Sequence, residues 1–163
     1  MNSYMKKILY LFLLILSEVV IAQSNFTLKV SGEVANPLKL SLEELAKMPH
    51  TNAVLKDKQG NSHTYRGVSV LDILAKANTL KEAHGAGLLK YVLVKCADGY
   101  QVLFSLAELD KDFTDKNVII ADSIDGQTLP EAKGPLRIIA EGEKKPARSS
   151  FQVTELIVGS VKN

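Results

Sequence analysis

Two Asp-Gly pairs, at residues 98–99 and 125–126, follow runs of apolar residues in the second half of the chain. The first pair lies between LKYVLVKC and YQVLFSL, and the second follows NVIIAD. An Asp-Gly pair between apolar runs is typical of a tight β-hairpin turn, because both residues tolerate a left-handed backbone. The centre of the chain is therefore predicted to be built from antiparallel strands.

Other segments extend this β pattern. Residues 26–34 alternate apolar and polar side chains, as a half-buried strand does. We also expect two strands within 50–68 that are joined by a polar turn at 59–61, and further strands in 135–140 and 151–158.

Short helices are predicted between the strands. Ser41 with Glu44 three residues later forms a capping box for a helix that Pro49 must end. Ser69 is the expected cap of a second helix, with one apolar face made of Val70, Leu71, Leu74 and Ala75. One or two helical turns are expected in 105–110, and a flexible loop at 84–87. The predicted fold class is α+β, with mixed β-sheets and short peripheral helices.

The first 22 residues have the pattern of a signal peptide. Lys6 and Lys7 precede an apolar stretch that ends at Ala22, where a signal peptidase would cut. We expect residues 1–22 to be removed and residues 23–163 to form one domain, exported to the periplasm or secreted, with no stable membrane insertion after cleavage.

Charge and cysteine content exclude several classes of protein. The formal net charge is +2, and removal of the signal peptide would leave a nearly neutral chain. Such a chain lacks the positive field of a nucleic-acid binder. A single cysteine, Cys96, excludes an intramolecular disulfide, and its place in a predicted strand favours a buried side chain over a reactive thiol.

Five segments occur in an order that resembles the molybdopterin-binding domain of the sulfite oxidase family. They are LKVSGEVANPLKLSLEELAKMP, YRGVSVLDILAKA, ADGYQVLFSLAELD, VIIADSIDGQTLP and GPLRIIAEGEKKPARS. The resemblance spans about residues 26 to 158 and implies the compact mixed α+β fold of that family. With the signal-peptide pattern, we expect a small, exported, stand-alone version of this domain. The resemblance also implies molybdopterin as the cofactor and an oxidoreductase-like protein.

The resemblance raises one difficulty at the metal. The family holds molybdenum with a cysteine thiolate, and the matching segment here is AVLKDKQGNS, with Lys56 and Asp57 about where that cysteine should be. Neither side chain replaces a soft thiolate. Cys96 lies some 40 residues later and would have to face the pocket to take this role. No residue is assigned a catalytic role, and no metal-ligating set is identified.

The expected cofactor-binding residues come mostly from the basic loop that follows the strand at 135–140. If this loop curls back over the strand, its cations and that of the strand converge in a geometry suited to a phosphate. The alternative is a solvated loop in which Glu141 and Glu143 neutralise half of the charge. The residues proposed to converge are Arg137, Lys144, Lys145 and Arg148.

Asp98 and Tyr100 complete the candidate set, because the family keeps a similar hairpin near its cofactor. Turn geometry for Asp98 and a core-covering role for Tyr100 are the alternative. Tyr65 and Arg66 stand before a helix entry, where an arginine could meet an anion or form a weak surface ion pair. The histidines His50, His63 and His84 lack metal-ligand spacing and are expected at the surface or in loops.

Two functions remain open from the sequence. The first is an exported molybdopterin-dependent oxidoreductase, or the cofactor domain of one, with an unknown redox partner. The second is a non-catalytic exported module that uses the same pocket for another small anionic ligand or for a protein partner.

Overall fold

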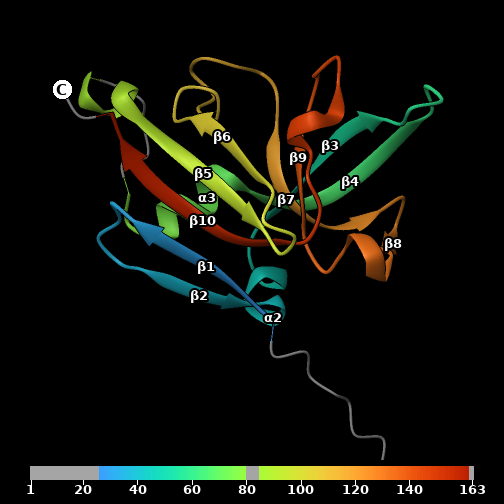
Figure 1. The fold of residues 1–163 in the computed structure, drawn as a ribbon, viewed down its shortest axis with the longest axis horizontal. Coiled ribbons are helices and arrows are strands. Elements are labelled where there is room, and N and C mark those ends of the chain that lie inside the picture. Colours follow the sequence, from blue (N-terminus) through green and yellow to red (C-terminus); the bar gives the residue numbers. More distant parts are fainter. Residues whose placement is uncertain (1–25, 80–84, 162–163) are drawn as a thin grey trace, which may run out of the picture.

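Two five-stranded sheets make up the protein in a computed structural model that describes residues 26–79 and 85–161 (Figure 1). The first sheet has the strand order β2-β1-β10-β5-β6. Strands β1 and β10 run parallel, whereas the other neighbours in this sheet are antiparallel. Its strands are β1 (Thr27–Gly32), β2 (Leu38–Ser41), β5 (Lys90–Cys96), β6 (Gln101–Ser105) and β10 (Val153–Ser160).

The second sheet is antiparallel throughout. Its order is β3-β4-β7-β8, and β9 pairs with β7 as well. Its strands are β3 (His50–Lys56), β4 (Ser62–Ser69), β7 (Val118–Ile124), β8 (Gln127–Thr128) and β9 (Arg137–Ala140). The fold is thus the α+β arrangement of mixed sheets with short helices that the sequence predicts.

Both Asp-Gly hairpins are confirmed. The first joins β5 to β6, with Gly99 at φ 85°. In the second, Asp125 and Gly126 both have positive φ, 49° and 79°, between β7 and β8. These backbone angles explain why the sequence places Asp-Gly at both turns.

The main hydrophobic core is shared by the two sheets. Phe104 and Leu156 contribute from the first sheet, and Ile120 and Ile138 from the second. A smaller cluster lies on the opposite face of the second sheet, where Tyr65, Leu55 and Ile139 are buried together, among others. The functional site described below is built on this second face.

Helix α2 (Leu42–Ala46) begins with the predicted capping box. The Ser41 side chain accepts a hydrogen bond from the Glu44 backbone, and the Glu44 carboxylate accepts one from the Ser41 backbone. Helix α3 (Val70–Lys76) begins after Ser69, whose side chain forms no capping hydrogen bond. The buried face of α3 includes Ile73, which the sequence analysis omitted, whereas Ala75 is only half-buried.

Two further segments were expected to contain little regular structure. Residues 105–110 form consecutive turns through i→i+3 hydrogen bonds, which fits the single helical turn expected there. The segment expected as a flexible loop contains a 3-10 helix, η1 (Gly85–Leu89), while His84 lies outside the described residues. Two more 3-10 turns, η2 (Glu131–Lys133) and η3 (Pro146–Arg148), flank β9.

The predicted signal peptide also lies outside the described residues. Within the part of the chain that the structure does describe, no helix has both the length and the apolar character required to cross a membrane.

Candidate functional site

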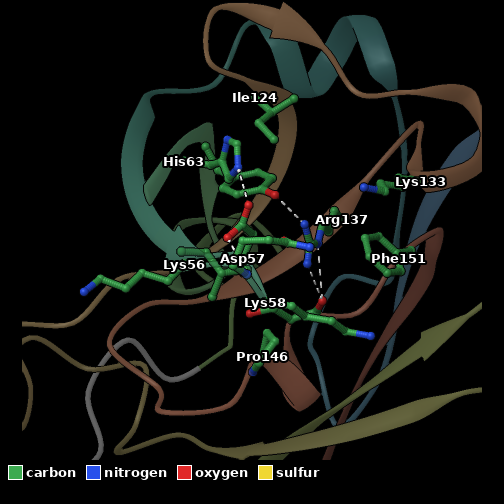
Figure 2. A pocket seen from close by; sticks show the side chains of 13 residues that line it. Lys56, Asp57, Lys58, His63, Ile124, Lys133, Arg137, Pro146 and Phe151 are labelled. Carbon is green, nitrogen blue, oxygen red and sulfur yellow. Dashed lines mark hydrogen bonds and ion pairs between the residues drawn. The ribbon is translucent and has the colours of Figure 1, made fainter. Parts of the chain in front are cut away.

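A pocket of about 440 Å³ opens on the face of the second sheet that is turned away from the main core (Figure 2). The strands β3, β4 and β9 and the loops that follow them supply most of its wall. Its lining residues are Leu55, Lys56, Asp57, Lys58, Gln59, His63, Tyr65, Ile124, Lys133, Arg137, Pro146, Ser149 and Phe151.

The side-chain alternation of β9 places Arg137 in this pocket. Ile138 and Ala140 belong to the main core, so Arg137 and Ile139 point to the other face of the strand. Arg137 is only 6% exposed. A strand residue in the wall of a pocket has little freedom to move, and its guanidinium is therefore held in place.

The partners of the Arg137 guanidinium are all neutral. It donates hydrogen bonds to the Tyr65 hydroxyl and, through Nε and one terminal nitrogen, to the Ser149 carbonyl at 3.3 and 3.1 Å. Its carbon lies 5.0 Å from the Tyr65 ring centroid and 4.2 Å from that of Phe151. Burial lowers the pKa of Arg137 because it desolvates the charge. No carboxylate of the described residues forms an ion pair with this guanidinium.

A buried cation without an acidic partner is costly, and proteins usually pair or neutralise such a group. A guanidinium has five N–H donors, and the contacts above use three of them. The remaining donors and the uncompensated charge suit an anion that enters the pocket.

Three lysines are among the residues that line the pocket of Arg137. Lys56, Lys58 and Lys133 are exposed and line the pocket, and no carboxylate of the described residues forms an ion pair with them. In Figure 2 the Lys58 side chain extends toward the side of the pocket where Phe151 and Lys133 lie. Lys133 also stands 5.7 Å from the Phe151 ring centroid.

Asp57, the one carboxylate among the lining residues, is used inside its own turn. It accepts hydrogen bonds from the backbone N–H groups of Gln59 and Asn61 at 2.9 and 2.8 Å and from the Asn61 side chain. These bonds, the Asn61 side chain first, hold the pKa of Asp57 below its usual value. Asp57 therefore shapes the β3–β4 turn and stays ionised.

His63 joins two hairpins at the edge of the pocket. Its Nδ1 lies 2.6 Å from Asp125 in the β7–β8 turn, and its Nε2 lies 3.4 Å from Asp57 in the β3–β4 turn. The hydrogen bond to Asp125, followed by that to Asp57, raises the pKa of His63. A carboxylate at each ring nitrogen favours the imidazolium, which donates from both nitrogens.

The structure separates the cations that were expected to converge. Arg137 lies in the pocket just described, whereas Arg148 is bound by Glu108 and Glu143 and stacks on the Phe104 ring at 4.4 Å. Lys144 lines a different pocket, and Lys145 is exposed. The convergence fails because Glu143 and Glu108 hold Arg148 against the first sheet.

The hairpin residues Asp98 and Tyr100 do not line the Arg137 pocket. The Asp98 carboxylate accepts a hydrogen bond from the Tyr100 backbone at 2.9 Å, which is the turn role considered as the alternative. The Tyr100 side chain is 48% exposed, and its hydroxyl donates to the Ala147 carbonyl at 3.1 Å. Tyr100 therefore attaches the basic loop to the hairpin.

Cys96 is buried, as expected, within the main core. Its sulfur donates to the Ser150 hydroxyl at 3.2 Å, and burial raises the pKa of the thiol. Cys96 is not among the residues that line the Arg137 pocket. Within the described parts of the chain, no group of three or more His, Cys, Asp or Glu is arranged to hold a metal ion.

The expectation of surface histidines is wrong for His50. Its side chain is 5% exposed and lies between the Met48 carbonyl and the Asp122 carboxylate, at 2.8 Å from each. His63 is partly exposed but belongs to the pocket. Arg66 lies in another pocket, beside β8, whereas its neighbour Tyr65 is buried against Arg137.

Comparison with known proteins places this fold in a family. A model of the oxidoreductase molybdopterin-binding domain matches residues 16–145. The chain belongs to this family, the molybdopterin-binding domain of the sulfite oxidase family, as the sequence resemblance implies. A search among curated proteins finds no match.

One solved structure with a similar fold is the sulfane dehydrogenase SoxCD from Paracoccus pantotrophus. It is 20% identical in sequence, with a TM-score of 0.63. The match covers 88% of this chain but 41% of that one, so the present chain spans about two fifths of the length of its neighbour. At this identity the likeness concerns the fold.

Sequence reasoning missed several lining residues, among them Lys58, His63, Lys133 and Phe151. The segment AVLKDKQGNS, residues 53–62, was matched to the part of the family that bears the metal-binding cysteine, and it contains Lys58. The other three come from separate strands and loops. Their proximity depends on the pairing of β4 with β7 and of β7 with β9, which no local pattern specifies.

Proposed function

We propose that the protein binds a phosphate-bearing ligand of the molybdopterin class in the Arg137 pocket. The observation that supports this most strongly is the buried Arg137 guanidinium, whose hydrogen-bond partners are all neutral. A phosphate accepts charge-assisted hydrogen bonds from a guanidinium and from lysines, and each is stronger than a bond between neutral groups. Membership of the molybdopterin-binding family supports the choice of ligand class.

The pocket suits the phosphate end of this cofactor better than its metal end. Molybdenum in this family takes a soft protein thiolate, as the resemblance implies, and the residues lining the pocket include neither cysteine nor methionine. Lys56 and Asp57 are matched to about that position, and the Asp57 oxygens are already hydrogen-bonded within the turn. We infer binding without a protein thiolate on the metal.

The second candidate is a non-catalytic module that binds another small phosphate-bearing anion in the same pocket. The observation that favours it is again the lack of a soft ligand among the lining residues. For either ligand the location is proposed to be outside the cytoplasm, on the basis of the signal-peptide pattern in residues 1–22.

Calorimetric titration with inorganic phosphate and with a phosphate monoester tests the anion site. Lys58→Gln and Lys133→Gln keep a polar side chain but remove a charge at the pocket, so each should weaken binding several-fold. Lys39→Gln, an exposed position on β2 outside the pocket, is the matched control and should bind like the wild type. Equal affinity in all four proteins would contradict the proposal.

A further inference from the structure

A second pocket, of about 610 Å³, adjoins the Arg137 pocket. The two share the end of β3 and the turn after it, with Leu55, Lys56, Asp57 and Lys58, and they share Pro146. The second pocket adds Lys116 before β7, the loop 141–144 and Val54. The β3–β4 turn thus contributes side chains to both pockets.

The carboxylates of the second pocket are occupied by internal contacts. Glu141 accepts hydrogen bonds from the backbone N–H groups of Val54 at 3.0 Å and Asn117 at 3.1 Å. Glu143 binds the Arg148 guanidinium, and Asp57 caps its own turn. None of these three carboxylates is paired with a lysine of the pocket.

Four lysines and three carboxylates line the second pocket, and one of these carboxylates, Glu143, is neutralised by Arg148. Lys56, Lys116 and Lys144 line the second pocket, and within residues 26–79 and 85–161 no carboxylate forms an ion pair with any of them. The alternation along β3 puts Lys56 on the same face as Val54, which lines the second pocket but not the first. Figure 2 accordingly shows the Lys56 side chain pointing away from Arg137.

The backbone of the loop 141–144 also accommodates one of these cations. A Cβ at Gly142 would lie 2.8 Å from Cε and 3.2 Å from Nζ of Lys116. Gly142 has φ +79°, a backbone conformation that glycine adopts without strain. Because Gly142 has no side chain, the Lys116 side chain can also lie across it. The Lys116 side chain therefore lies against the loop at the edge of the second pocket.

We propose that the two pockets form one site for an extended polyanion that carries at least two phosphate groups. One group contacts Arg137, Lys58 and Lys133, and the other lies among Lys56, Lys116 and Lys144. The ligand class is an oligophosphate or a molecule extended by a diphosphate. This inference rests on the proposed function for the Arg137 pocket and adds a second phosphate subsite in the adjoining pocket.

Titrations with inorganic phosphate and tripolyphosphate at one fixed ionic strength test the inference. Wild-type protein should bind tripolyphosphate about tenfold or more tightly than phosphate, because the longer anion reaches both sets of cations. The double variant Lys116→Gln/Lys144→Gln should lose most of that advantage yet keep its affinity for phosphate. Lys133→Gln should weaken binding of both anions, and Lys39→Gln should affect neither.

The outcomes separate the two proposals. If Lys133→Gln weakens tripolyphosphate binding and the double variant leaves it unchanged, the second subsite does not exist and the proposed function stands. If Lys133→Gln and Lys58→Gln leave the affinities for both anions unchanged, the proposed function fails, and the extended site fails with it. Fixed ionic strength matters because screening alone changes the affinity of a more highly charged ligand.

Discussion

The guanidinium carbon of Arg137 lies 4.2 Å from the centroid of the Phe151 ring, and Phe151 is 40% exposed at the wall of the pocket. A cation over an aromatic face contributes about 0.5–2 kcal/mol, depending on how far it is desolvated. We predict that Phe151→Leu lowers the free energy of unfolding by about 1 kcal/mol and weakens phosphate binding, measured by urea denaturation and calorimetry.

Phe113→Leu is the control for this change, because Phe113 is 52% exposed and lines another pocket. The control should leave phosphate binding unchanged. If Phe151→Leu bound phosphate like the wild type, the ring would not help to position Arg137.

Arg148 and Lys145 are neighbours in the basic loop but differ in their contacts. Arg148 binds Glu108, Glu143 and the Leu103 carbonyl and stacks on Phe104, whereas Lys145 is exposed. Arg148→Ala should therefore lower the free energy of unfolding by about 1–2 kcal/mol, the range of such ion-pair and cation–π contacts together. Lys145→Ala should change it by less than about 0.5 kcal/mol, as is usual for surface positions. Equal stability of the two variants in urea would show that the contacts of Arg148 contribute nothing.

The link of His63 to Asp125 and Asp57 predicts a pH-dependent stability. The pKa of His63 in the folded protein is raised above its usual 6.5, chiefly by the hydrogen bond to Asp125. The stabilisation is therefore fully present below pH 6.5 and is lost as the pH rises through the raised pKa. His63→Gln should flatten the decline in unfolding free energy on this alkaline side, measured by denaturation between pH 6 and pH 9. An unchanged slope would contradict the ion-pair role.

Two N-cap serines provide a matched pair within one protein. The Ser41 side chain accepts a hydrogen bond at the start of α2, whereas the Ser69 side chain forms none at the start of α3. Ser41→Ala should cost about 1 kcal/mol of stability, the usual loss for a capping side chain, and Ser69→Ala should cost less. Thermal melts of both variants compare them directly, and the reverse order would refute the assignment of the caps.

The strands and tight turns of this fold follow from local sequence. Asp125 and Gly126 adopt the left-handed backbone that their residue types favour, and the Ser41 and Glu44 pair caps α2 as written in the sequence. Residues 105–110 form the short helical turn expected there, and reciprocal hydrogen bonds between Ser105 and Glu108 stabilise its start.

The site was only partly predictable because it is made by long-range register. Arg137 was identified from its basic context, and it does line the pocket. What places its side chain there is the pairing of β9 with β7 and the alternation of side chains along β9. Arg148 was expected beside it, and no local pattern indicates that Glu108, forty residues earlier in the chain, binds Arg148 instead. His63 reaches Asp125 across the β4–β7 pairing, which sequence spacing does not reveal.

The most direct test of the central claim is a pterin assay on mature protein purified from a host that makes the molybdenum cofactor. Acid and oxidant should release a fluorescent pterin in proportion to the protein, and the yield should fall for Lys58→Gln and Lys133→Gln but not for Lys39→Gln. Molybdenum measured in the same samples reports whether the metal is retained without a protein thiolate. Absence of releasable pterin from the wild-type protein in such a host would contradict binding of a molybdopterin-class ligand in the Arg137 pocket.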